Sequence, residues 1–191
     1  MKLNNLLIGV LLAVPCAALS DQGDLPIKTS GPYAGVGGGF SKIDTRDGSI
    51  SVGGESFGYR ILGGYRFAHL PLPFNIDLGI EVAYADLGKV DEVAAGANVE
   101  VDMKSLITAG VVYVPISPRW DVFGKAGVYF WDGKVTADGI ETSNESGSDL
   151  SFGLGIAMQT GSSFGAQLEI ESVDALDGIW VATLSATYQF K

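Results

Sequence analysis

Residues 150–159 read LSFGLGIAMQ, and large and small side chains alternate along the whole segment. If the segment is extended, one face carries large apolar side chains, namely Leu150, Phe152, Leu154, Ile156 and Met158. The opposite face carries small or polar side chains, namely Ser151, Gly153, Gly155, Ala157 and Gln159. A period of two residues is typical of a β-strand whose two faces meet different environments. The segment therefore predicts a strand between an apolar and a polar medium.

The same alternation recurs along the rest of the chain after the first thirty residues. It is clear at 74–85, 164–171 and 180–190, and weaker at 32–42, 56–67, 104–114 and 120–131. No helical period of comparable strength is found in this part of the chain. The sequence therefore predicts an all-β fold of eight strands, each of about 9–12 residues.

The segments between the predicted strands alternate in length and composition. Residues 43–55, 86–103, 132–149 and 172–179 are mostly long, polar and acidic. Residues 68–73, 115–119 and 160–163 are short and rich in Pro, Gly and Ser. Four long loops at one end and three short turns at the other are the layout of an antiparallel up-and-down barrel in an outer membrane.

The length and composition of the chain limit the classes of protein to which it can belong. The length of 191 residues suggests one domain. The 22 acidic residues outnumber the 12 basic ones, which argues against a nucleic-acid partner. Hydrophobic residues make up 47% of the chain. After the first twenty residues, however, no segment has the roughly 20 consecutive apolar residues of a membrane helix. The chain is therefore expected to be either a soluble globule or a membrane barrel.

The first twenty residues have the features of a secretory signal peptide. They contain Lys2, an apolar run at 6–14, and the small residues Ala18 and Ser20 before the expected cleavage site. Residues 21–31 would form a short periplasmic leader, and 32–191 the barrel. A lipoprotein reading of Cys16 is disfavoured by the preceding Pro15. Because Cys16 is the only cysteine, the exported chain would contain no disulfide.

The character of the two faces distinguishes a soluble barrel from a membrane barrel. A soluble barrel turns its apolar face inward, whereas a membrane barrel turns it toward lipid. The polar faces here are rich in Gly, Ser, Thr and Ala and lack the dense Lys and Glu of a water-facing surface. The apolar faces carry aromatic residues near their ends, as an interfacial belt requires: Tyr84, Trp120, Phe130, Trp180, Tyr188 and Phe190. A transmembrane barrel is therefore predicted.

This orientation places charged residues inside the barrel. In residues 121–135, DVFGKAGVYFWDGKV, Lys125 is on the face opposite Val122 and Val128. A lysine on the lipid side at mid-membrane would cost about 2–4 kcal/mol, so Lys125 is expected in the lumen. Glu81, Glu169 and Arg60 are on inward faces of other strands. Because an unpaired buried charge is costly, we predict that these four residues form a barrel-interior polar network.

Four segments resemble the transmembrane domain of the outer membrane protein A family. They are LGIEVAYADLGKV (78–90), DVFGKAGVYFWDGKV (121–135), SDLSFGLGIAMQ (148–159) and LSATYQF (184–190). The resemblance implies an eight-stranded barrel in the cell outer membrane of a Gram-negative bacterium. The implied partners are outer-membrane lipids, lipopolysaccharide, periplasmic chaperones and the outer-membrane barrel assembly machinery. That machinery is expected to read the terminal strand, whose assembly signal would include Tyr188 and Phe190.

The chain departs from this family in two respects. Larger members continue into a periplasmic peptidoglycan-binding domain, and that activity is not expected of a chain that ends at Lys191. The best-known member has an interior gate of two acidic and two basic residues. Glu81 matches one acid, but the other three positions align with Gly110, Ala157 and Gln167. A switching gate is therefore not expected, whereas a packed polar interior is.

Catalytic and metal-binding chemistry has little support in the sequence. His69 is the only histidine and lies in a predicted turn, so neither a Ser–His pair nor a zinc site is expected. No cofactor is expected. The long loops carry two groups of acidic residues that either bind divalent cations or, as the better reading, are simply solvated: Asp91, Glu92, Glu100 and Asp102, and Asp138, Glu141, Glu145 and Asp149.

The sequence therefore predicts a non-enzymatic barrel with a structural role in the outer membrane and four acidic extracellular loops. A second reading is an adhesin whose surface loops bind host surface ligands. A third reading is a narrow, porin-like pore through the barrel.

Overall fold

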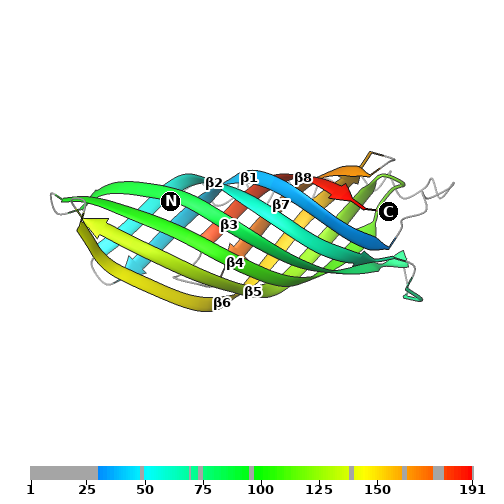
Figure 1. Cartoon of the computed structure of the whole chain (residues 1–191), viewed down its shortest axis with the longest axis horizontal. Helices are drawn as coiled ribbons and strands as arrows, with labels where there is room; N and C mark the ends of the chain where they lie inside the picture. The colour runs from blue at the N-terminus through cyan, green and yellow to red at the C-terminus, as the bar shows by residue number, and fades with distance from the viewer. Residues whose placement is uncertain are drawn as a thin grey trace.

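A computed structural model of the chain describes residues 30–47, 50–68, 70–72, 75–94, 97–137, 140–160, 163–173 and 179–190. The expected signal peptide, most of the leader and His69 lie outside these residues. Eight strands form the fold (Figure 1): β1 (Gly31–Asp47), β2 (Ile50–Phe67), β3 (Asp77–Ala94), β4 (Ala97–Pro115), β5 (Trp120–Ala137), β6 (Ile140–Gln159), β7 (Phe164–Val173) and β8 (Ile179–Gln189). Within the described part of the chain, no helix is long and apolar enough to cross a membrane.

The strands form one closed antiparallel barrel in sequence order, which confirms the predicted fold class. Closure is made by β1 and β8, which pair from Tyr33↔Gln189 to Ile43↔Ile179. A row of paired residues that starts at Gly31 passes once around the barrel and returns to β1 at Ser41, ten residues further along. This stagger tilts the strands against the barrel axis, as closure requires.

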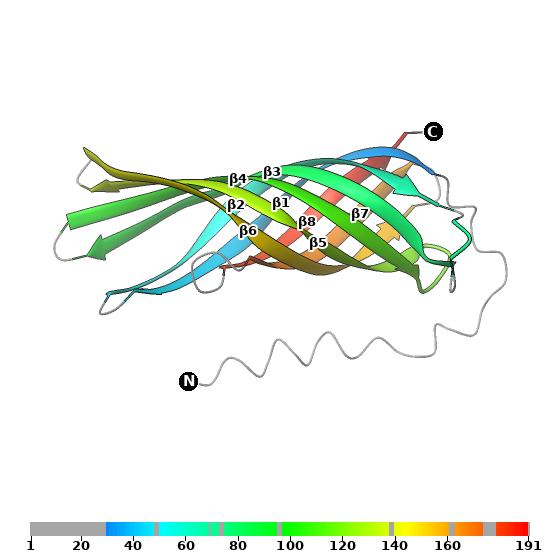
Figure 2. The same cartoon turned by 90° about the horizontal axis from the view of Figure 1, so that it is seen from below.

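Six of the eight strands are longer than the alternation predicts. β1 and β2 are separated only by residues 48–49, β3 and β4 by 95–96, and β5 and β6 by 138–139. The prediction that most of 43–55, 86–103 and 132–149 forms loops is therefore wrong. Backbone pairing continues there, as in Lys89↔Asp102 and Lys134↔Asn144, because ladder hydrogen bonds do not need an apolar face. Figure 2 shows the three hairpins extending beyond β7 and β8, away from the C terminus.

The two faces of each strand have the predicted orientation. On β6 the large side chains Phe152 and Leu154 are each 58% exposed on the outer wall, whereas Ser151 is buried inside. On β5, Phe123 and Tyr129 are buried in the lumen. The apolar surface of the barrel therefore faces outward, as in a barrel surrounded by lipid.

Exposed aromatic side chains lie on the outer wall near both ends of the barrel. Near the short turns they are Tyr65, Phe67, Trp120, Phe164, Tyr188 and Phe190, and toward the long hairpins they are Phe40, Phe57, Tyr59, Tyr84, Phe130 and Trp180. Several of these rings contact one another, with centroids 5.1 Å apart in both Phe164–Tyr188 and Tyr188–Phe190. Two such belts on either side of an apolar band match the two interfaces of a bilayer.

Candidate functional site: the charged interior of the barrel

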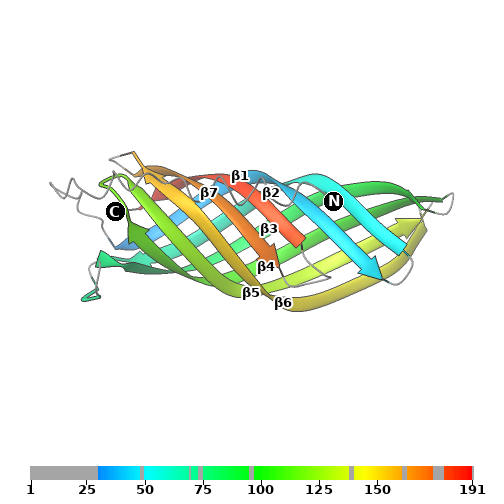
Figure 3. The ribbon, with the colours of Figure 1, turned by 180° about the vertical axis from the view of Figure 1, so that it is seen from behind.

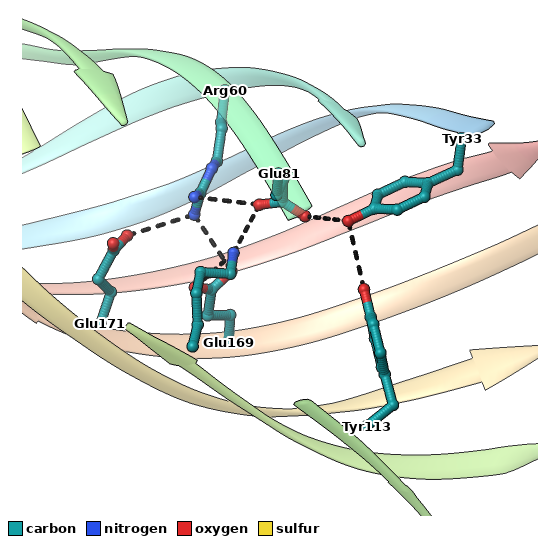
Figure 4. A network of polar contacts seen from close by, with 7 residues as sticks. Tyr33, Arg60, Glu81, Tyr113, Glu169 and Glu171 are labelled. Carbon is teal, nitrogen blue, oxygen red and sulfur yellow. Dashed lines mark hydrogen bonds and ion pairs between the residues drawn. The ribbon is translucent and has the colours of Figure 1, made fainter. Parts of the chain in front are cut away.

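The four residues of the predicted interior network come from four different strands. Arg60 is on β2, Glu81 on β3, Lys125 on β5 and Glu169 on β7, and all four side chains are buried. Each is on the inward face because side chains alternate across a strand and the neighbouring residues carry the apolar outer wall. Figure 4 shows how Arg60, Glu81 and Glu169 point toward one another across the lumen.

Lys125 lies between two carboxylates. Its Nζ is 2.6 Å from Glu81 Oε1 and 2.9 Å from Glu169. Lys125 is only 5% exposed, so bulk water does not solvate its ammonium group. Charge-assisted hydrogen bonds of this length are among the stronger polar contacts in proteins. The lysine therefore links β5 to β3 and to β7 through the interior.

Arg60 joins the same cluster from β2 and brings in a further acid. Its Nη1 donates to Glu169 Oε2 at 3.1 Å and to Glu171 Oε2 at 3.3 Å. Its Nη2 is 3.5 Å from Glu81 Oε1. Glu171 was not among the predicted network residues, although it is two positions from Glu169 on the same face of β7. The cluster contains three carboxylates and two cations.

The cluster continues through two tyrosines toward the end with the short turns. Tyr33 on β1 donates from its hydroxyl to Glu81 Oε2 at 2.9 Å. The hydroxyls of Tyr33 and Tyr113 are 3.2 Å apart, and Figure 4 shows the Tyr33 hydroxyl between Glu81 and Tyr113. Neither tyrosine was predicted as part of the network. Their hydroxyls let the apolar body of each ring fill the lumen without leaving a buried oxygen unpaired.

A second charged cluster lies near the short turns. Arg66 donates to Asp77 Oδ2 through Nε at 3.0 Å and through Nη2 at 2.6 Å, and Nη1 donates to Asp121 Oδ2 at 3.0 Å. The Arg66 guanidinium also lies 4.3 Å from the centre of the Tyr113 ring. The prediction missed this cluster. The available signal was that Arg66 follows Arg60 by an even number of residues and so shares its face.

Glycines on the inward face make room for the buried side chains. A Cβ added to Gly64 would lie 2.5 Å from Tyr33 Oη, and one added to Gly153 would lie 2.8 Å from Glu169 Oε1. Close approach of this kind is a common reason for glycine within a strand. The small residues and the large charged ones therefore occupy complementary volumes.

One interior position inferred from the family resemblance is wrong. Gly110 pairs with Ile80 and Ala126 on the outer wall, and the inward residue beside it is Val111. Ala157 and Gln167 do lie in the interior. The alignment with the family was displaced by one residue on β4. Such a displacement exchanges the two faces of a strand, which explains the error.

Above the first cluster, toward the long hairpins, the lumen is filled by apolar side chains. They are Leu87, Met103, Ile107, Val173, Val181 and the partly buried Trp131. The Trp131 indole donates from Nε1 to Asp149 Oδ2 at 2.6 Å. A cavity of about 20 Å³ lined in part by Arg60, Tyr129 and Glu171 remains below this layer, which is room for about one water molecule. Side chains therefore fill the lumen at the level of this apolar layer and of the two charged clusters.

The charged side chains of both interior clusters are arranged as ion pairs. No group of three or more His, Cys, Asp and Glu residues in the described part of the chain is placed to hold a metal ion. His69 and the side chains of the acidic residues Asp91, Glu92, Glu100, Asp138 and Glu141 lie outside the described residues.

An apolar outer wall with aromatic belts and a charged interior define a transmembrane β-barrel. The model of the outer membrane protein beta-barrel domain family matches residues 6–190. The chain belongs to this family, and its location is the cell outer membrane.

Solved structures share the fold at low sequence identity. Neisserial surface protein A matches with a TM-score of 0.61 and 10% identity over 85% of this chain and 100% of that one. The N-terminal β-barrel domain of Pseudomonas aeruginosa OprF matches with a TM-score of 0.54 and 15% identity over 85% and 100%. Ail, the attachment invasion locus protein of Yersinia pestis, gives 0.54 and 17% over 85% and 100%. No curated protein sequence shows significant similarity to the chain.

Proposed function

We propose that the protein is a non-enzymatic structural barrel of the outer membrane, with a closed lumen and long hairpins on the cell surface. The observation that carries this proposal is the contact of Lys125 with both Glu81 and Glu169, because it joins β3, β5 and β7 through the middle of the lumen. A barrel filled in this way holds its shape without a ligand. Its contribution to the envelope is then its outer wall and its surface hairpins.

The outer wall supports this role. The exposed apolar band between two aromatic belts gives lipid tails and interfacial groups a continuous surface on all eight strands. Outer-membrane lipids and lipopolysaccharide are the proposed partners of this wall. Neither partner requires an opening into the barrel.

Envelope permeability tests the structural role. We expect a strain that lacks the protein to take up a large hydrophobic dye faster than its parent. A chain with the β3–β4 and β5–β6 hairpins shortened at their tips should restore the barrier, because the wall and the interior clusters are intact. Unchanged dye uptake in the deletion strain, under conditions in which the parent makes the protein, would contradict the proposal.

Surface binding is a second candidate function, and the length of the hairpins favours it. β3–β4 and β5–β6 form a continuous paired extension that passes well beyond the end of β7. One structural neighbour, Ail, has been solved in complex with the heparin analogue sucrose octasulfate. The net charge of this chain is −10, so we do not extend a polysulfated ligand to it. If the second function holds, shortening the two hairpins abolishes attachment to host cells and leaves dye uptake unchanged.

The terminal strand is proposed as the assembly signal. Tyr188 and Phe190 are exposed on the outer wall, and the Tyr188 ring contacts the rings of both Phe190 and Phe164. We propose that the outer-membrane barrel assembly machinery reads this aromatic end after periplasmic chaperones deliver the chain.

A further inference from the structure

The small cavity inside the barrel lies where the first charged cluster meets the apolar layer above it. Its lining includes the polar residues Arg60 on β2, Tyr129 on β5 and Glu171 on β7, and the apolar residues Leu87 and Ile107. Its volume of about 20 Å³ is enough for one water molecule and too small for a larger ligand. The strands that surround it run side by side around the lumen in Figure 3. The cavity is therefore enclosed by several strands and has both polar and apolar walls.

Three polar atoms at this cavity have no hydrogen-bond partner in the part of the chain that the structure describes. They are Arg60 Nε, Tyr129 Oη and Glu171 Oε1. Arg60 makes its ion pairs through Nη1 and Nη2, and Glu171 makes its ion pair through Oε2. Figure 4 shows this contact between Arg60 and Glu171. All three side chains are buried, and buried polar groups in folded proteins almost always have a partner.

Two serine hydroxyls lie near these atoms but do not satisfy all three. The Ser105 hydroxyl, which is beside Tyr129, donates to the backbone oxygen of Ala85 at 3.4 Å. The Ser151 hydroxyl, which is beside Glu171, forms no hydrogen bond with another described residue. If Ser151 turned toward Glu171 Oε1, the Arg60 donor and the Tyr129 hydroxyl would still be unpaired. A further group in the cavity is therefore required.

The three atoms together select a neutral ligand that both donates and accepts hydrogen bonds. The Arg60 nitrogen only donates, the Glu171 carboxylate oxygen accepts, and the Tyr129 hydroxyl does either. A cation in this space would be repelled by the Arg60 guanidinium, and an anion would be repelled by the Glu171 carboxylate. A water molecule accepts from Arg60 and Tyr129 and donates to Glu171. Water therefore matches the cavity in size, charge and hydrogen bonding.

We propose that the cavity binds one ordered water molecule that bridges Arg60, Tyr129 and Glu171. This water joins β2, β5 and β7 and extends the ion-pair cluster to Tyr129. The Tyr129 ring packs in the apolar layer, so its hydroxyl is the point at which that layer meets the polar network. The inference goes beyond the structural function proposed above, because side chains close the lumen at this level whether or not the water is bound.

A crystal structure of the refolded chain, at a resolution that shows ordered water, is the direct test. Crystals would be grown in rubidium chloride, because rubidium reveals a bound monovalent cation by its anomalous scattering. We expect a water oxygen about 2.7–3.2 Å from Arg60 Nε, Tyr129 Oη and Glu171 Oε1, without an anomalous peak. A rubidium peak in the cavity would overturn the proposal. A cavity without density, with Ser151 bonded directly to Glu171, would overturn it as well.

A double-mutant cycle tests the bridge in a membrane. Tyr129→Phe, Glu171→Gln and the double variant would be unfolded by urea in lipid vesicles. Because the two groups share one water, the effect of the double variant on the unfolding equilibrium constant should differ from the product of the single effects by about three-fold or more. Additive effects would overturn the bridge. Heat-modifiable gel mobility verifies folding of each variant, and the crystal structure decides if one of them does not fold.

Tyr129→Phe combined with Asp77→Asn is the matched control for the cycle. Asp77 pairs with Tyr113 and Tyr129 with Ile107 on the shared neighbour β4, which places the two residues about 20 Å apart along the strand. Their effects should multiply to within about two-fold. A coupling as large as that of Tyr129 and Glu171 would mean that the cycle reports a general change in the barrel, which would overturn the assignment to the cavity.

Ser151→Ala separates the water from a direct contact. If the water carries the coupling, the cycle of Tyr129→Phe and Glu171→Gln repeated in a Ser151→Ala background should give the same coupling to within about two-fold. Loss of the coupling in this background would show that the serine links the two groups, and the proposal would be wrong.

Discussion

The ammonium group of Lys125 on β5 lies 2.6 Å from Oε1 of Glu81 on β3, and the intervening strand β4 contributes neither charge. The same ammonium group reaches Glu169 on β7. These contacts cross the lumen instead of following the wall. The interior cluster therefore occupies the space that an aqueous channel would need. It also holds the strands that it joins in fixed positions relative to one another.

Removal of the central cation should destabilise the barrel strongly. Lys125→Met leaves Glu81, Glu169 and Glu171 with Arg60 alone, and breaking a buried ion pair from one side costs about 3–5 kcal/mol. Urea unfolding in lipid vesicles, followed by tryptophan fluorescence, would measure the loss. The control is Lys104→Met on β4, where the lysine is exposed and the change should stay within about 0.5 kcal/mol.

A second substitution checks that charge is the cause. Lys125→Met combined with Glu169→Gln should recover part of the loss, because one uncompensated carboxylate is removed with its partner. Equal stabilities of the native chain and Lys125→Met would contradict the role given to the cluster.

Gly64→Ala should disturb the interior through Tyr33. The added methyl group would lie 2.5 Å from both Tyr33 Oη and the backbone oxygen of Ile80, and the backbone cannot easily move. Overpacking of this kind costs about 1–3 kcal/mol. The matched control is Gly124→Ala, whose new methyl group would meet only Leu154 at 3.7 Å. The same unfolding experiment should separate the two, and equal stabilities would argue against the tight packing at Tyr33.

Leu154→Arg tests which medium surrounds the outer wall. Leu154 is exposed on β6 between the levels of Phe130 and Trp120, which belong to the two aromatic belts, and an arginine facing lipid at mid-membrane costs about 2–4 kcal/mol. Leu70→Arg, in the turn after β2, should cost almost nothing because that residue lies outside the strands. Folding yield in vesicles would measure both. A Leu154→Arg variant as stable as Leu70→Arg would mean that the wall is not lipid-facing.

The alternation in the sequence was sufficient to predict eight strands and the orientation of their faces. It also placed Lys125 and Glu81 on inward faces, because a period of two fixes the face of every residue once one is known. The contacts of Arg66 with Asp77 and Asp121 could not be predicted in this way. They depend on the stagger between strands, which alternation within one strand does not determine.

The ends of the strands could not be predicted from the sequence pattern either. Outside the bilayer the hairpins need no apolar face, so the alternation fades at residues such as Lys89 and Lys134 while the backbone ladder continues.

The closed lumen is the central claim, and single-channel recording of the refolded chain in a planar bilayer tests it most directly. Folding would be verified by heat-modifiable gel mobility. We predict no current steps, because the Lys125, Glu81, Glu169 and Arg60 side chains fill the middle of the lumen. Reproducible steps whose size changes in Lys125→Met would contradict the claim and make the protein a narrow pore.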